Sequence, residues 1–175
     1  MKRVKVKDEF KKYMARMKSY VGRQDPVKMQ ATMPARLARA VRGLRHAQLV
    51  RRPRPKKWSI QEIVGHLADT EVVYGFRLRM MLAQPGAPIQ AYDQDKWADN
   101  LAYKRQPIGK LVEQIRVLRA ANLDLVRRLP HAWRNRYGMH SERGRESVAR
   151  TLLLLAGHDV NHLNQIAAIR RQFGW

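Results

Sequence analysis

Two histidines placed four residues apart near the end of the chain carry the clearest chemical signal in this sequence. His158 and His162 enclose the segment Asp-Val-Asn, and they follow the mainly apolar run 151–157. On a helix, side chains four residues apart lie on one face about one turn from each other. Both imidazoles can then reach one metal ion, so the spacing indicates a metal-binding pair.

The same two histidines lie on the apolar face of their expected helix, which allows a second interpretation. That face continues at helical spacing through Val148, Leu152, Leu155, Ile166 and Ile169. Such periodicity points the face into a protein core. A histidine in that position is often a hydrogen-bonded core residue, and this alternative stays open beside metal binding.

A third histidine favours the metal site. His66 lies early in another strongly helical segment, and three neutral imidazoles can hold a divalent ion while leaving coordination positions open for water or substrate. Asp69, further along that helix, is a candidate for orienting an imidazole, for a fourth ligand or for a surface ion pair. We interpret His131 and His140 as loop histidines.

Length and composition restrict the protein class. The 175 residues suit one domain, or one domain with an arm, and the absence of cysteine excludes disulfides and thiolate ligands. No stretch reaches the roughly 18 consecutive apolar residues of a membrane span, and the N-terminus lacks the apolar core of a signal peptide. A cytoplasmic protein is therefore expected.

The net charge of +22 is unevenly distributed. Residues 1–57 hold 19 Lys and Arg against 3 acids, a net +16, while residues 58–175 hold 17 against 11, a net +6. If the protein binds nucleic acid or another polyanion, this asymmetry predicts nonspecific binding through the N-terminal third. Residues 10–21 repeat apolar side chains at helical steps, which predicts an amphipathic helix that packs on the domain, forms a mobile arm or binds a polyanion.

Capping residues and breaks predict four long helices. Asp25 before Pro26 starts the first, in which Pro34 causes a kink or a late start, and Ser59 with Glu62 forms a capping box at the second. The expected helices cover about 26–49, 60–83, 107–129 and 147–171. The long connection 84–106 lets the third helix run parallel to the second, and residues 130–146 are expected to lack regular structure beyond extended pieces.

The helix lengths also predict that the histidines meet. His66 is seven residues into its helix and His162 about nine from the end of its own, or roughly 10 and 14 Å from those ends. If the two helices are antiparallel, the three rings lie at one height.

Several segments, taken in their order and spacing, resemble the DinB-like family, also called the DinB/YfiT-like metalloenzymes. They are residues 58–69, 92–97, 119–123 and 158–166, within a match that spans about 26–172. The resemblance implies an all-α, up-down-down-up four-helix bundle that is commonly dimeric, with a metal site at His66, His158 and His162. It also implies a division into a basic N-terminal extension, residues 1–25, and a bundle domain, residues 26–175.

The resemblance further implies a function. Characterised relatives include mycothiol-dependent maleylpyruvate isomerase and bacillithiol transferases, so we expect Zn, Ni, Mn or Fe to activate a thiol or water for transfer to a small electrophilic substrate. The expected partners are a small thiol or electrophile and a second copy of the chain. Two alternatives remain, namely a nonspecific polyanion-binding helical protein and a helical dimer without a reaction.

Overall fold

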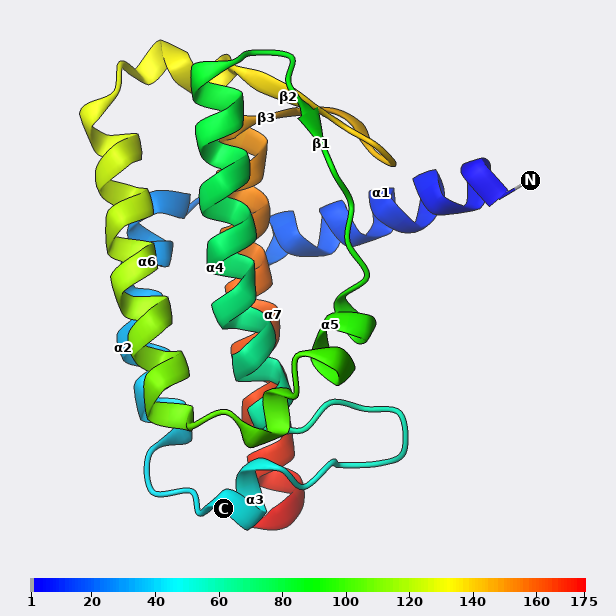
Figure 1. Cartoon of the computed structure of the whole chain (residues 1–175), viewed down its shortest axis with the longest axis vertical. Coiled ribbons are helices and arrows are strands. Elements are labelled where there is room, and N and C mark those ends of the chain that lie inside the picture. Colours follow the sequence, from blue (N-terminus) through cyan, green and yellow to red (C-terminus); the bar gives the residue numbers. More distant parts are fainter. Residues whose placement is uncertain (1) are drawn as a thin grey trace.

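Four helices form the body of the molecule: α2 (Pro26–Val41), α4 (Ile60–Ala83), α6 (Ile108–Arg128) and α7 (Val148–Phe173). The computed structural model describes residues 2–175, with side chains from residue 8 onward. In Figure 1, α4 and α6 run upward while α2 and α7 run downward. The predicted all-α, up-down-down-up four-helix bundle with a long crossover between its second and third helices is therefore confirmed.

The predicted helix starts are set by side-chain caps. Asp25 accepts from the Val27 amide at 2.7 Å, and Ser147 accepts from the Arg150 amide at 3.2 Å. At α4, the Ser59 amide donates to Glu62 Oε2 at 2.8 Å, while the Ser59 hydroxyl accepts from the Glu62 amide at 3.3 Å. Each cap satisfies backbone donors that a helix N-terminus leaves without partners.

The predicted helix 26–49 is divided, which corrects the expectation. After α2 ends at Val41, the chain turns through Gly43 at φ +76° and resumes as the single turn α3 (His46–Leu49). Pro34 lies inside α2 without ending it, so the late start was wrong. The Gln30 carbonyl, which loses its helical donor at Pro34, accepts instead from Arg119 Nη1 at 3.2 Å.

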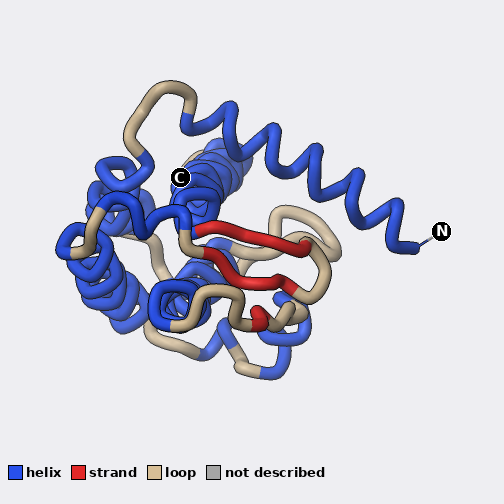
Figure 2. Tube along the Cα trace, turned by 90° about the horizontal axis from the view of Figure 1, so that it is seen from above, coloured by secondary structure: helices blue, strands red, loops and turns tan. Residues whose placement is uncertain are grey.

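Both connections contain short regular elements, and those of the second include the extended pieces that were expected there. The first holds β1 (Pro88–Ile89), α5 (Gln94–Asn100) and the 3₁₀ turn η1 (Tyr103–Arg105). The second holds the 3₁₀ turn η2 (His131–Asn135), β2 (Tyr137–His140) and β3 (Gly144–Ser147). β2 pairs with β1 in parallel and with β3 in antiparallel register, forming the small sheet beside the helices in Figure 2.

An additional helix, α1 (Lys2–Val21), crosses α7 at the side of the bundle (Figure 1). Met17 and Val21 are buried there, and a methyl group at Gly157 of α7 would lie 2.5 Å from the Met17 carbonyl oxygen. The structure shows this segment as a helix packed on the domain, while its binding of a polyanion stays a prediction. The side chains of residues 1–7, which hold part of the predicted basic extension, lie outside the described region.

The bundle interior has two apolar clusters with a polar layer between them. One cluster contains Leu37, Ile63, Leu67, Ile115 and Ile166, and the other contains Leu78, Met81, Leu123, Leu152 and Leu155. On α4, α6 and α7 the buried residues Glu71, Arg119 and Asp159 separate the two. Within the described region, no helix is long and apolar enough to cross a membrane.

Candidate metal centre

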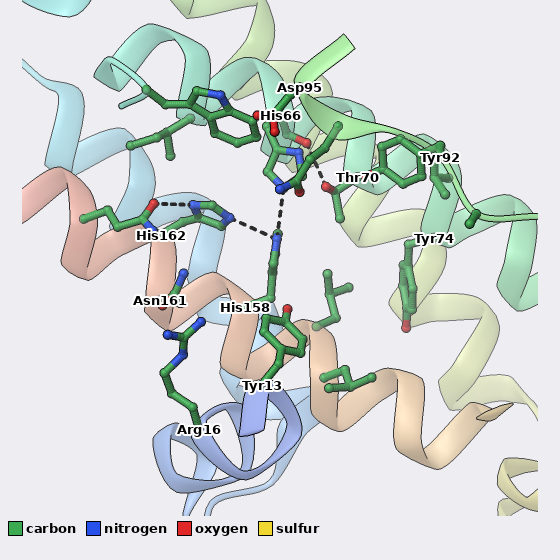
Figure 3. A pocket seen from close by; sticks show the side chains of 18 of the residues that line it. Tyr13, Arg16, His66, Thr70, Tyr74, Tyr92, Asp95, His158, Asn161 and His162 are labelled. Carbon is green, nitrogen blue, oxygen red and sulfur yellow. Dashed lines mark hydrogen bonds between the residues drawn. The ribbon is translucent and has the colours of Figure 1, made fainter. Parts of the chain in front are cut away.

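The three predicted histidines meet at one point between α4 and α7. His158 Nε2 lies 3.0 Å from His66 Nε2 and 3.0 Å from His162 Nε2 (Figure 3). Because α4 and α7 are antiparallel, residues in the first third of α4 and the middle of α7 reach the same height. The structure thus brings together all three residues that the spacing singled out.

Burial keeps the three imidazoles neutral at pH 7. It lowers the pKa of His66 to about 3, with a smaller effect of His162, and it lowers the pKa of His162 to about 4 against the opposing effect of Gln165. The pKa of His158 falls well below its ordinary value, first through burial and then through the other two histidines. A neutral imidazole has the lone pair that a metal ligand needs.

Two neighbouring side chains orient the cluster. His162 Nδ1 lies 2.8 Å from Gln165 Oε1, which is an acceptor, so we assign the proton to Nδ1 and the free lone pair to Nε2. The Trp58 ring stacks on His162 with centroids 6.4 Å apart and lies 4.9 Å from His66. Sequence reasoning missed Gln165, although its position three residues after His162 is a usable signal.

The donor set fits a divalent metal ion. Nitrogen ligands at about 2.0–2.1 Å from zinc in tetrahedral geometry are roughly 3.3 Å apart, close to the two Nε2 separations seen here. The ligand atoms of the three histidines lie within 4.8 Å of one another. Among the described residues, no other set of three or more His, Asp or Glu side chains converges closely enough to hold a metal ion. His66 Nδ1 and His158 Nδ1 have no hydrogen-bond partner in that region.

The other candidate residues lie outside the cluster. Asp69 accepts a hydrogen bond from the Tyr103 hydroxyl at 2.6 Å, and it is not among the residues whose ligand atoms converge in the cluster. His131 is exposed in η2. His140, interpreted as a loop residue, is instead buried in β2, where its Nδ1 accepts from the Glu142 amide at 3.2 Å.

The histidine cluster opens onto a cleft of about 1280 Å³. Both long connections reach this cleft, through Tyr92 and Asp95 in one and through His140 and Arg143 in the other. Residues 53–58 and helix α1 complete its lining. The sheet brings the two connections to the same side of the bundle as the three imidazoles.

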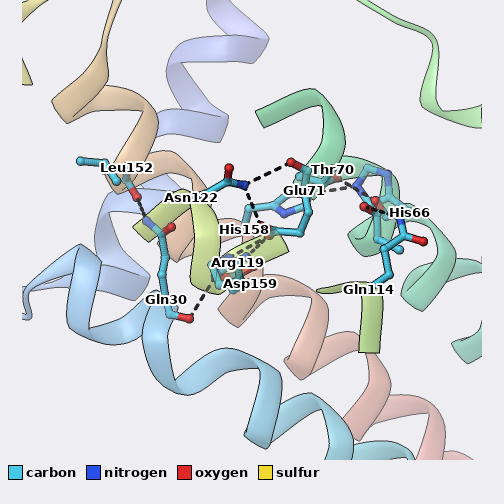
Figure 4. A network of polar contacts seen from close by, with 11 residues as sticks. Gln30, His66, Thr70, Glu71, Gln114, Arg119, Asn122, Leu152, His158 and Asp159 are labelled. Atoms are coloured by element: carbon cyan, nitrogen blue, oxygen red, sulfur yellow. Dashed lines mark hydrogen bonds and ion pairs between the residues drawn. The ribbon is translucent and has the colours of Figure 1, made fainter. Parts of the chain in front are cut away.

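Behind the cluster, Arg119 joins three helices through buried ion pairs (Figure 4). Its Nε donates to Glu71 Oε1 at 2.8 Å and its Nη1 to Asp159 Oδ2 at 2.7 Å. Burial raises the pKa of both carboxyl groups, and the guanidinium opposes that shift. Asp159 directly follows His158, so the network fixes the backbone that carries this histidine. Sequence reasoning missed this network, although charged residues at inward positions of the three helices are a usable signal for it.

Comparisons with known proteins agree with this architecture. The DinB superfamily model matches residues 29–166. A candidate metal-dependent hydrolase, by name, from Bacillus mycoides (strain KBAB4) is 25% identical over 143 residues, or 82% of each chain. Another from Oceanobacillus iheyensis is 28% identical over 144 residues, or 80% of each chain.

Among solved structures, YfiT from Bacillus subtilis has a similar fold. It is described as a candidate metal-dependent hydrolase with an unusual four-helix bundle topology. The TM-score is 0.82 at 23% sequence identity, and the match covers 86% of both chains. At that identity the likeness establishes the shared fold.

Proposed function

The chain belongs to the DinB superfamily, and from this membership we propose that it is an enzyme in which His66, His158 and His162 hold one divalent metal ion. The observation that carries the proposal is the convergence of three neutral imidazoles at the wall of a cleft. The relatives named as candidate metal-dependent hydrolases support it. Zinc, nickel, manganese and iron are all compatible with nitrogen ligands.

The chain's own residues prepare the centre for an incoming small molecule. His162 is held in one tautomer by Gln165, and Trp58 covers the side of the imidazoles next to the connector 51–57. The side facing the cleft stays accessible. When bound, a divalent ion supplies Lewis-acid chemistry, polarising a carbonyl or lowering the pKa of a thiol or water.

We propose that water or a small thiol attacks an electrophilic substrate bound in this cleft. Hydrolysis accords with the names of the relatives, while thiol transfer accords with the family resemblance of the sequence. Turnover of an electrophile with and without an added low-molecular-weight thiol distinguishes the two. The homodimer and the cytoplasmic location expected from the sequence remain proposals as well.

Metal analysis tests the proposed centre. Purified wild-type protein reconstituted with zinc, nickel, manganese or iron should hold about one ion per chain, and His162→Ala should lose most of it because two imidazoles remain. His131→Ala is the matched control, since this exposed histidine lies in η2 away from the cluster. Wild-type protein that holds no metal after reconstitution would contradict the proposal, as would equal losses in both variants.

A further inference from the structure

Helix α1 lies outside the matched residues 29–166, yet it forms part of the wall of the cleft. Its position is fixed by the buried Met17 and Val21 and by the close approach of Met17 to Gly157. Gly157 immediately precedes His158. The helix therefore has a defined place at the wall of the cleft, and among its described side chains Tyr13 and Arg16 line that cleft.

Both side chains line the same cleft as the three histidines. In the view of Figure 3, the Tyr13 hydroxyl is directed toward His158, and the Arg16 side chain extends from α1 toward α7. Burial raises the pKa of Tyr13 to about 12, against the effects of Arg143 and Arg16, so its hydroxyl remains a donor at neutral pH. The Arg16 guanidinium carbon lies 5.8 Å from the Tyr13 ring centroid.

The rest of the wall contributes further cations. Arg77 of α4 is partly buried, and Arg143, between β2 and β3, pairs with Glu146 at 2.9 Å. Burial, followed by the positive charge of Arg143, lowers the pKa of Arg77, which indicates that the two guanidinium groups share one region. Arg77 donates one hydrogen bond to the Gln90 carbonyl and approaches the Tyr92 ring to 5.7 Å.

The described lining carries more positive than negative charge, with six Lys and Arg side chains against the carboxylates of Asp95, Glu142 and Glu146. Within residues 8–175, neither Arg16 nor Arg77 lies within 4.0 Å of a carboxylate, unlike Arg143. Arg54, Lys56 and Lys57 add further cations at the connector. A cleft with excess charge of one sign concentrates small molecules of the opposite charge. Guanidinium groups offer only donors, in a geometry that matches carboxylate and phosphate oxygens.

We propose that this cleft selects a small-molecule substrate carrying a carboxylate or phosphate group, with Arg16 of α1 and Arg77 of α4 as specificity residues. The inference rests on the proposed function, because the anchored anion would hold the reactive part of the substrate at the histidine cluster. It also gives α1 a role beyond packing. The substrate site then includes a wall from outside the residues that match the family.

Calorimetric titration of zinc-loaded, full-length protein with inorganic phosphate and with succinate tests the inference. Each anion should bind at one saturable site, and succinamide, the uncharged counterpart of succinate, should bind at least tenfold more weakly. Arg16→Gln and Arg77→Gln should each weaken binding about tenfold, the effect of losing a charge-assisted hydrogen bond. Arg23→Gln is the control, since it removes the same charge from an exposed residue outside the cleft.

The outcomes separate this inference from the proposed function. Zinc content, measured on the same samples, reports on the histidine site independently of anion binding. Zinc-loaded protein that binds neither anion, or binds both equally well in the Arg16 and Arg77 variants, overturns the inference and leaves the metal site intact. Equal weakening in Arg23→Gln would assign the effect to overall charge and overturn it too.

Discussion

At the scale of residues, the buried Arg119 links the charged groups of the bundle interior. It is 2% exposed and satisfies two carboxylates together with the Gln30 carbonyl that Pro34 leaves without a helical donor. Breaking a buried ion pair leaves an uncompensated charge, which costs more than the pair contributes. One side chain thus provides both the hydrogen-bond donor that the proline in α2 removes and the cation that the two buried carboxylates require.

Replacing this guanidinium should destabilise the protein strongly. Arg119→Leu leaves Glu71 and Asp159 buried without a cation, and we expect the free energy of unfolding to fall by about 3–5 kcal/mol. Urea denaturation followed by circular dichroism measures the change. Arg116→Leu is the control on the same helix, because its pair with Glu113 is exposed to solvent and contributes little. Similar losses of unfolding free energy in the two variants would show that the buried network contributes no more to stability than the exposed pair.

The residues of the site were only partly predictable from sequence. His66, His158 and His162 follow from helical spacing and are found together. Gln165 and Arg77 were missed because their roles depend on which neighbours the tertiary structure brings near them. The partner of Asp69 was missed for the same reason, since Tyr103 comes from η1, a 3₁₀ turn that no local pattern revealed.

At the scale of elements, helix starts were easier to predict than pairings between distant segments. Caps such as Ser59 and Ser147 act within one turn, so they can be recognised locally. The pairing of Pro88 with Met139 joins residues 51 positions apart, and two-residue β1 carries no periodic signal. The break between α2 and α3 was missed because Leu44 continues the helical spacing of Leu37 and Val41 across the turn.

Because α1 packs against Gly157, we expect Gly157→Ala to destabilise the full chain and to stabilise a chain that lacks α1. In the full chain, Gly157→Ala should destabilise by about 1–3 kcal/mol, because the added methyl group would lie 2.5 Å from the Met17 carbonyl oxygen. In a variant lacking residues 1–24 that close approach is absent, and alanine should stabilise α7 by up to about 1 kcal/mol. Thermal unfolding of the four proteins measures both effects.

Gly109→Ala provides the matched control for this comparison. Gly109 lies in α6 with no heavy atom within 4 Å of an added methyl group, so alanine should be neutral or stabilising with and without α1. Destabilisation by Gly157→Ala in the shortened chain would mean that the glycine serves the bundle and not the packing of α1.

At the scale of the whole molecule, some of the cations in the basic N-terminal third are engaged in contacts within the chain. Arg52 donates from Nε to Glu62 Oε2 at 3.0 Å, and its charge is used to anchor the connector to the start of α4. Arg51 stacks over the Phe173 ring at 4.2 Å. Arg54, Lys56 and Lys57 are exposed cations on the same connector. A test of polyanion binding should therefore change these three and spare Arg52.

Polyanion affinity should follow this connector and fall steeply with salt. Replacing Arg54, Lys56 and Lys57 by Gln should weaken binding of duplex DNA and flatten the plot of log affinity against log salt by about one unit for each phosphate that is no longer neutralised. Replacing the exposed Lys110, Arg128 and Arg171 removes equal charge from the rest of the chain and should have a smaller effect. His162→Ala should leave DNA affinity unchanged, because that histidine is buried in the cluster. Binding that is sequence-specific and resistant to salt, measured by fluorescence anisotropy over a salt series, would contradict this assignment and favour nucleic-acid recognition as the function.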